Sequence, residues 1–380
     1  MKFLIIIFFI SISAFAGYFA NDFINKGASE LINPFVSQKE STSFPLLTFS
    51  IPNLKTRNYQ SSEIILEKII SKEEKYDSYQ FSYQTMGRKM TGQINIPDNI
   101  TTSPIQKHQA IIMIRGYVPI EIYKTGMGTE NAASVLANNG YITVAPDFFG
   151  YGKSDPEPED TWQARFEKPI AIIELIQSLE KNGVPTDLDI ITTVSENIKI
   201  DEIGMWAHSN GGQIALTTLE IIDENIPTTL WAPVTAPFPY SILYFSDELE
   251  DEGKEQRKWL SIFEEKYNSF DFSLTQHLNL LKGPLQIQHG NADDAALIYW
   301  SKEFIDKIDK ENLRRAEALE ELKNLDEEKN NATDSGSTDL SSLEKIELEF
   351  FEYDNTNHNM VPNWDKAINR DISFFNKHLR

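Results

Sequence analysis

A serine between small residues is the first candidate for chemistry in this sequence. Ser209 lies in the segment Ala207-His-Ser-Asn-Gly211, which matches the Gly-x-Ser-x-Gly nucleophile elbow except that alanine replaces the first glycine. Residues 201–207 have the pattern of a strand and residues 211–222 that of a helix. A tight turn between them would present the serine hydroxyl at a sheet edge. The alternative is a serine at a helix N-cap, followed by glycines in a loop.

A serine nucleophile needs a histidine base and an acid that fixes the tautomer of that base. In a strand-and-helix architecture of this kind the acid follows the serine and the histidine comes last. Of the six histidines, His358 alone follows the last predicted strand, in an asparagine-rich loop before the closing helix. We therefore predict His358 as the base, with an unrelated surface histidine as the alternative. The other histidines adjoin the serine, precede the candidate acid or lie in segments not aimed at the site: His108, His208, His277, His289 and His378.

The candidate acid lies in the loop after the predicted strand 285–289. In the segment His289-Gly-Asn-Ala-Asp293 the glycine permits a sharp turn that brings a carboxylate back towards the histidine. We predict Asp293 as the acid and keep Asp294 as the alternate. Asp294 is expected to brace the loop.

The negative charge that develops on the reacting carbonyl needs two backbone amide donors. Such donors are typically worth about 3–4 kcal/mol each of transition-state stabilisation. The amide of Asn210, directly after the serine at the start of a helix, is the first candidate. The second should come from the loop after the strand 110–114, where we choose Tyr117 because Gly116 permits close approach. Arg115 in the same loop is a candidate substrate contact.

Strands and helices alternate through most of the chain and are joined by short links. This alternation predicts a mostly parallel sheet covered on both faces, whose site lies beyond the carboxyl ends of the strands. A strand-like segment at 62–70 and a hairpin over 79–97 would open the sheet with antiparallel strands. The candidate residues all follow predicted strands, and that convergence is stronger than any one motif. The later strands are expected at 110–114, 141–147, 201–207, 228–234, 285–289 and 346–353.

Two stretches interrupt the alternation. Residues 236–282 are aromatic and acidic, and their position predicts a small helical cap over the site. Tyr240 and Tyr244 are candidate substrate contacts in it, and the alternative is a pair of peripheral helices whose aromatics pack on the core. Residues 307–343 form a charged helical and then low-complexity insertion.

Composition narrows the classes of partner. The formal charge of −22 disfavours nucleic acid and anionic lipid as partners, and the absence of cysteine excludes disulfides and thiol chemistry. No metal-binding cluster, phosphate loop or dinucleotide fingerprint is visible, so no metal or cofactor is expected. The expected partner is a small peptide or ester substrate, and the sequence does not define an oligomeric state.

The first twenty residues are predicted to be an export signal or an uncleaved membrane anchor. A lysine precedes an apolar run, and Ala14-Phe-Ala16 resembles a small-x-small cleavage site. The run is almost long enough to span a bilayer. Either interpretation places the rest of the chain outside the cytoplasm, with contact to a membrane only through this segment. Residues 21–60 are predicted to be a tether and residues 61–380 the folded domain.

These motifs together resemble the α/β-hydrolase superfamily over residues 61–380. The segments 140–154, 207–212 and 289–294 resemble the catalytic domain of prolyl-oligopeptidase-type serine peptidases, and dienelactone-hydrolase-like enzymes are similar too. The resemblance implies the α/β-hydrolase fold and a serine hydrolase with the triad Ser209, Asp293 and His358. The chain departs from the family pattern at Ala207 and at Arg115-Gly-Tyr117, where His-Gly is common.

Two classes of function follow from the sequence. The first is an exported or membrane-tethered serine hydrolase that acts on a peptide or an ester, with a peptidase placed before a carboxylesterase. The second is a non-catalytic surface binding protein that retains the fold. The presence of Ser209, Asp293 and His358 together favours the enzyme.

Overall fold

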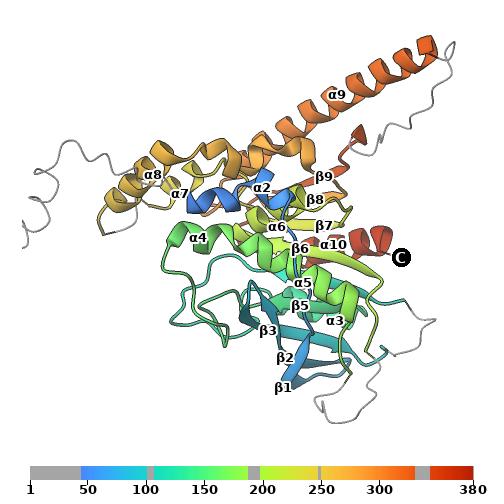
Figure 1. Ribbon diagram of the computed structural model, residues 1–380. Helices are drawn as coiled ribbons and strands as arrows, with labels where there is room; N and C mark the ends of the chain where they lie inside the picture. The colour runs from blue at the N-terminus through green and yellow to red at the C-terminus, as the bar shows by residue number, and fades with distance from the viewer. Residues whose placement is uncertain (1–43, 101–106, 187–196, 247–249, 330–342, 380) are drawn as a thin grey trace, which may run out of the picture. The chain divides into compact units, whose positions relative to one another are not determined.

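A nine-stranded sheet forms the centre of the described part of the protein (Figure 1). The computed structural model describes residues 44–100, 107–186, 197–246, 250–329 and 343–379. Leu46–Arg380 form one compact unit. The strand order is β1-β2-β3-β5-β4-β6-β7-β8-β9. The strands are β1 (Ile65–Lys72), β2 (Tyr76–Thr85), β3 (Arg88–Pro97), β4 (Gln109–Ile114), β5 (Ile142–Pro146), β6 (Glu202–His208), β7 (Thr228–Trp231), β8 (Leu285–Gly290) and β9 (Leu348–Tyr353).

The sheet changes from antiparallel to parallel as the sequence predicts. β1, β2, β3 and β5 pair antiparallel in that order, and the expected hairpin is β2–β3, with Gly87 in its turn. From β5 onward every neighbouring pair is parallel. The carboxyl ends of β4, β6, β7, β8 and β9 therefore meet at one edge of the sheet, where the candidate residues follow them.

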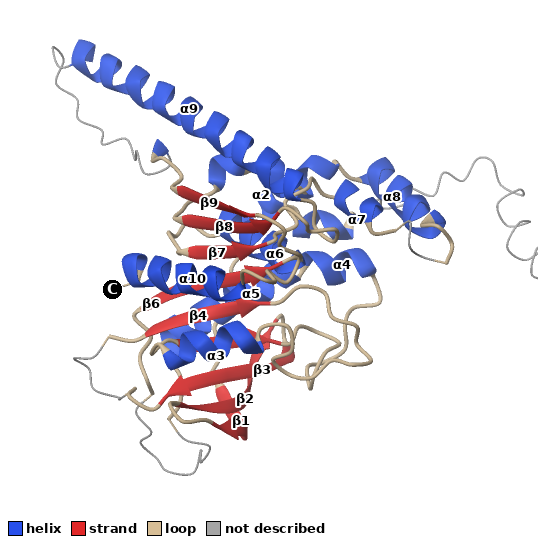
Figure 2. Ribbon diagram, turned by 180° about the vertical axis from the view of Figure 1, so that it is seen from behind, coloured by secondary structure: helices blue, strands red, loops and turns tan. Residues whose placement is uncertain are grey.

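Helices cover both faces of this sheet, as Figures 1 and 2 show from opposite sides. α5 and α6 pack on one face, and α3 and α10 pack on the other. The longer helices are α3 (Glu130–Asn138), α5 (Lys168–Asn182), α6 (Asn210–Ile221), α8 (Lys254–Lys266), α9 (Ile298–Lys329) and α10 (Trp364–His378). The short helices are η1 (Pro45–Phe49), α2 (Ile51–Lys55), α4 (Thr161–Phe166), α7 (Tyr240–Tyr244), η2 (Ser269–Phe272), η3 (Leu274–Gln276) and η4 (Leu278–Leu280).

The apolar strand β4 shows why both faces must be covered. Its residues Ile111 and Met113 join the core beneath α3 and α10, whereas Ile112 and Ile114 join the core beneath α5 and α6. All four side chains are fully buried. Because successive side chains of a strand point to opposite faces, a continuous apolar run requires helices on both.

The folded unit begins earlier than the sequence analysis predicts. Residues 21–43 of the expected tether lie outside the described residues, but Ile51 and Leu54 of α2 are only 1% exposed. They pack against Ile170 and Ile173 of α5 and against Ile221 of α6. The prolines that suggested a tether mislead, because a proline in the first turn of a helix is tolerated.

A helical insertion connects β7 to β8, in the range predicted for the cap. It comprises α7, α8 and the short helices η2 to η4. Phe238 and Phe263 of the insertion are buried against Phe166 of α4, with ring centroids 4.9 and 6.0 Å from that ring. These aromatics therefore hold the insertion to α4, while Tyr240 and Tyr244 stay 50% and 41% exposed.

The charged segment that begins at residue 307 continues a helix rather than starting a separate element. Phe304 and Ile308 on the first half of α9 are buried in the core beneath α5 and α6. Arg315 is 3% exposed and donates hydrogen bonds to the carbonyl oxygens of Leu278 and Leu281. The second half of α9 extends away from the sheet in Figures 1 and 2. The low-complexity part of the predicted insertion, residues 330–342, lies outside the described residues.

The predicted export signal or anchor, residues 1–20, also lies outside the described residues. No helix in the ranges that are described is both long and apolar enough to cross a membrane.

Candidate active site

Ser209 occupies a strained turn between β6 and α6. Its backbone angles are φ 57° and ψ −123°, a conformation that a residue with a side chain rarely adopts. Its amide donates to the carbonyl oxygen of Trp231 at 2.9 Å, and its own carbonyl oxygen accepts from Gly212 and Val234, both at 3.0 Å. Hydrogen bonds from the next strand and from the helix thus fix the turn.

Three glycines allow the chain to pass close to Ser209. A Cβ atom on Gly116 would lie 2.8 Å from the Ser209 Cβ, so the loop after β4 runs directly against the serine. A Cβ on Gly211 would overlap the Ile114 carbonyl oxygen, and one on Gly212 would overlap the Pro233 side chain. The motif therefore needs small residues because the start of α6 packs against the ends of β4 and β7.

Asp293 and His358 come together at the ends of β8 and β9. His358 Nδ1 donates to Asp293 Oδ2 at 2.8 Å, although the two residues are 65 positions apart in the sequence. Asp293 Oδ1 accepts the backbone amides of Ala295 and Ala296, both at 2.9 Å. This is the contact that the predicted acid and base require. Asp294, the alternate acid, is exposed, and its backbone carbonyl accepts a hydrogen bond from Tyr244.

His289, which the sequence analysis set aside, is the second histidine on Asp293. Its Nε2 lies 2.8 Å from the Ala296 carbonyl oxygen and 3.1 Å from Asp293 Oδ2, and its Nδ1 lies 2.8 Å from Ser301 Oγ. A carbonyl oxygen only accepts, so Nε2 carries the proton and Nδ1 accepts from the serine hydroxyl. Burial raises the pKa of Asp293, but the hydrogen bonds from His289 and His358 outweigh it and hold that pKa well below its usual range.

His208 supports the base from the other side. Its Nε2 donates to the His358 carbonyl oxygen at 2.9 Å, and the centroids of the two imidazole rings are 4.6 Å apart. Burial, followed by the charge of His358, lowers the pKa of His208 from its ordinary value to about 4. His208 is therefore a neutral donor at neutral pH, and sequence reasoning missed it because it searched only for the base.

The backbone amides predicted for the oxyanion are available. Among the hydrogen bonds of the described residues, none uses the amide of Asn210 or that of Tyr117. The Tyr117 side chain is 77% exposed. The candidate oxyanion donor is therefore the backbone amide of Tyr117. The contact between Gly116 and Ser209 places the loop of the second amide beside the serine.

Arg115 is not placed for substrate contact, contrary to the sequence-based prediction. It is 6% exposed, and its terminal nitrogens donate to the carbonyl oxygens of Gly116 and Asp147 at 2.9 and 2.8 Å. The rings of Tyr123 and Tyr151 lie 4.7 and 4.1 Å from the guanidinium carbon. Arg115 therefore holds the loop that carries Gly116.

The two cap tyrosines differ in position. The Tyr244 hydroxyl donates to the Asp294 carbonyl oxygen at 3.1 Å, and its ring packs against Trp300 at 5.0 Å between centroids. Tyr244 thus adjoins the loop of the acid. The Tyr240 hydroxyl donates to Glu264 of α8, so this side chain is engaged within the cap.

No hydrogen bond between the serine hydroxyl and the base is formed in the described part of the chain. Within the described ranges, no hydrogen bond joins the Ser209 hydroxyl to the His358 ring, whose Nδ1 is bound to Asp293. Such bonds often form only when substrate is present. In the same ranges no group of three or more acidic or histidine side chains is arranged to hold a metal ion.

The sheet order, the elbow after β6, the acid loop after β8 and the histidine loop after β9 define the α/β-hydrolase fold. Residues 126–229 match a family model described as alpha/beta hydrolase fold, a span that includes Ser209 but neither Asp293 nor His358. No curated protein sequence matches the chain.

Solved structures share this fold at low sequence identity. An esterase from Pyrococcus furiosus is 13% identical with a TM-score of 0.50, and the match covers 84% of this chain and 99% of that one. A putative dipeptidyl aminopeptidase IV from Bacteroides ovatus is 13% identical with a TM-score of 0.51, over 80% of this chain but 36% of that one. A puromycin-hydrolyzing peptidase from Mycobacterium tuberculosis is 11% identical with a TM-score of 0.52, over 80% and 39%. The predicted α/β-hydrolase fold is confirmed.

Replacing Asp293 by asparagine should lower kcat on the order of 10⁴-fold, because asparagine cannot fix the tautomer of His358 or stabilise its charged form. The measurement is steady-state hydrolysis of a chromogenic ester at pH 8. Asp294→Asn is the matched control and should keep most of the activity, since its carboxylate is exposed. Loss of activity in the control alone would assign the acid to Asp294 instead.

Replacing His208 by glutamine should flatten the dependence of stability on pH. Between about pH 6.5 and pH 4 the unfolded chain binds a proton at residue 208 that the folded chain does not bind, so the folded state loses stability as the pH falls. The variant should escape about 2–3 kcal/mol of that loss. Urea unfolding of both proteins at pH 7 and pH 4.5 measures the difference. Equal losses in the two proteins would contradict the assigned pKa.

Proposed function

We propose that this protein is an exported or membrane-tethered serine hydrolase that cleaves a peptide or ester bond through an acyl-enzyme on Ser209. The observation that carries the proposal is the 2.8 Å hydrogen bond between Asp293 and His358 at the sheet edge where Ser209 is held in a strained turn. A surface binding protein has no need of this strain or of a buried carboxylate on a histidine.

The proposed reaction begins with the Ser209 hydroxyl, which attacks the substrate carbonyl while His358 Nε2 takes its proton. Asp293 holds the protonated ring and stabilises its charge. The amides of Asn210 and Tyr117 receive the oxyanion, and His358 then returns the proton to the leaving group. A water molecule, activated by the same histidine, releases the acyl group from the serine.

The choice between a peptide and an ester substrate rests on the sequence motifs rather than on the geometry of the site. The motifs 140–154, 207–212 and 289–294 resemble those of prolyl-oligopeptidase-type peptidases, which favours a peptide. A carboxylesterase is the alternative, because this fold hosts both activities. The fold alone therefore does not select between a peptide and an ester.

A fluorophosphonate probe tests the mechanism directly. The wild-type protein should be labelled at Ser209, and Ser209→Ala should lose the label while it retains the same unfolding transition. A matched panel of aminoacyl 4-nitroanilides and short acyl 4-nitrophenyl esters then assigns the bond that is cleaved. Equal labelling of the two proteins, or none in folded wild type, would refute the proposal.

The apolar run at residues 1–20 supports export or membrane attachment of the protein. When the full chain is expressed in a bacterial host, we expect it outside the cytoplasm, with a mature N-terminus at Gly17. Cell fractionation and N-terminal sequencing measure both. An intact Met1 in the membrane fraction would indicate the uncleaved anchor, whereas an intact Met1 in the cytoplasm would contradict both forms of the proposal.

A further inference from the structure

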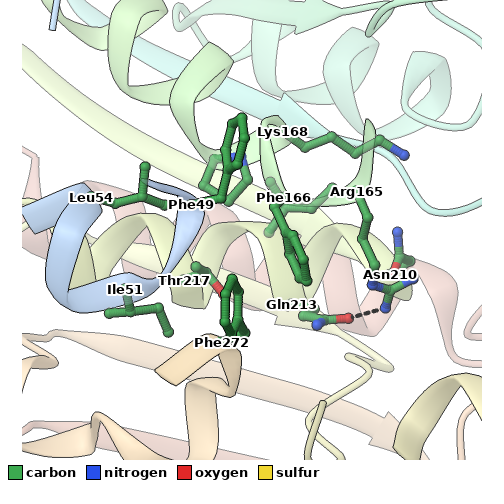
Figure 3. Close-up of a pocket in the computed structure, with 12 residues that line it drawn as sticks. Phe49, Ile51, Leu54, Arg165, Phe166, Lys168, Asn210, Gln213, Thr217 and Phe272 are labelled. Carbon is green, nitrogen blue, oxygen red and sulfur yellow. Dashed lines mark hydrogen bonds between the residues drawn. The ribbon is translucent and has the colours of Figure 1, made fainter. Parts of the chain in front are cut away.

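A cavity of 290 Å³ lies between the core and the cap insertion. Its walls come from α4 and the start of α5 on one side and from Ile242 of α7 and Trp259 of α8 on the other. Arg165 and Lys168 line it. The same two cations line a smaller cavity of 30 Å³ that reaches Asn210, the residue after the proposed nucleophile. Figure 3 shows Arg165, Lys168 and Asn210 around this smaller space. The two cations therefore lie between the cap and the elbow.

Arg165 is only partly satisfied by its neighbours. Its Nη2 donates to Gln213 Oε1 at 2.6 Å, as the dashed line in Figure 3 marks. Its Nε is buried without a hydrogen-bond partner, and its guanidinium carbon lies 5.6 Å from the centre of the Phe238 ring. An arginine keeps its charge at neutral pH, so a half-buried cation lies here, and among the described residues its side-chain hydrogen bond is to a neutral amide.

Lys168 adds a second positive charge beside Arg165. In the described part of the chain neither Arg165 nor Lys168 has an acidic oxygen within 4 Å, whereas the adjacent Glu167 pairs with Arg88 at 2.7 Å. Glu157 lines the same cavity and is exposed, and its charge partly offsets the effect of burial on the pKa of Lys168. Burial lowers the pKa of Lys168 to about 8, which leaves the lysine mostly charged at neutral pH. Two cations side by side are conspicuous in a chain whose formal charge is −22.

The position of these cations fixes where an anion would lie on a substrate. Gln213, the hydrogen-bond partner of Arg165, follows Asn210 by three residues on α6. Residues at this spacing are about 5–6 Å apart at their Cβ atoms. Arg165 and Asn210 therefore lie at the same part of α6, and both line the smaller cavity.

We infer that the cavity beneath the cap binds a carboxylate carried by the substrate, and that Arg165 and Lys168 recognise it. This inference rests on the proposed function, and it names the class of substrate: a small ester or amide with a free carboxylate near the bond that is cleaved. The carboxylate supplies a negative charge opposite the two cations that line the cavity.

Binding to the full chain with Ser209→Ala tests the inference without turnover. The probes form two pairs, each with and without a free carboxylate. Glutaric acid mono-4-nitroanilide and its methyl ester place the charge on the acyl side, and 4-butyramidobenzoate and its methyl ester place it on the leaving-group side. Calorimetry should show that one of the two acids binds roughly tenfold or more tightly than its methyl ester. Hydrogen bonds to a charged group typically increase affinity by about this factor. The pair that responds identifies the side.

Arg165→Gln or Lys168→Gln, each added to the Ser209→Ala variant, should reduce the preference for the acid over its methyl ester to about twofold or less. Lys181→Gln, an exposed lysine at the other end of α5, is the matched control and should preserve the preference. Two separate substitutions keep the test valid if one of them unfolds the protein.

The outcomes separate the two proposals. Equal binding of acid and ester in both pairs, or a preference that survives both substitutions, would overturn the carboxylate site whatever the catalytic result. A preference that depends on Arg165 or Lys168, together with failure of wild type to react with the fluorophosphonate, would retain the site and reject the proposed hydrolase.

Discussion

The strained backbone of Ser209 is the constraint on which the rest of the structure depends. A conformation with positive φ at a serine costs on the order of 1–3 kcal/mol and persists only when its surroundings enforce it. Here β7 supplies hydrogen bonds on one side, and α6 continues the turn on the other. The loop after β4 closes the third side at Gly116, and Arg115 holds that loop from within the core. Parallel pairing of β4, β6 and β7 brings these three supports to one edge.

The second organising feature is a hydrogen-bonded chain that links four elements. It runs from Ser301 on α9 through His289 on β8 to Asp293, and from there through His358 to His208 on β6. Each imidazole donates to a carbonyl or carboxylate oxygen, which cannot donate in return. That acceptor therefore fixes which ring nitrogen carries the proton. The carboxylate at the centre receives hydrogen bonds on both oxygens, which keeps it ionised and oriented. The position of the base is thus determined by residues from β6, β8 and α9 as well as by its own loop.

The sheet and the contact between acid and base can be predicted from the sequence, because both follow from local patterns along the chain. Buried parallel strands are apolar throughout, and a residue after such a strand must lie at the sheet edge, which places Ser209, Asp293 and His358 together. The roles of other residues near the site depend on tertiary packing, which the sequence pattern does not show. Whether Arg115 faces a substrate or the core is decided by Tyr123 and Tyr151, which lie on loops of no regular pattern. The role of His208 is set by a partner 150 residues away, and that of His289 by the way in which the acid loop folds back onto its ring. The short helix α2 has too few residues to show a helical period, and one of them is a proline.

The length of chain between Asp293 and His358 has little bearing on their geometry. β8 and β9 pair in parallel from Leu285 opposite Leu348 to Gly290 opposite Tyr353, so the sheet itself holds the two loops side by side. α9 leaves from the end of the sheet that carries the candidate site, and β9 begins at the opposite end. Any extra residues enter there, and each doubling of a flexible connection adds only about 0.6 kcal/mol of closure entropy. The hydrogen bond on which the proposed base depends therefore follows from the pairing of β8 with β9, and the length of chain between Asp293 and His358 does not set it.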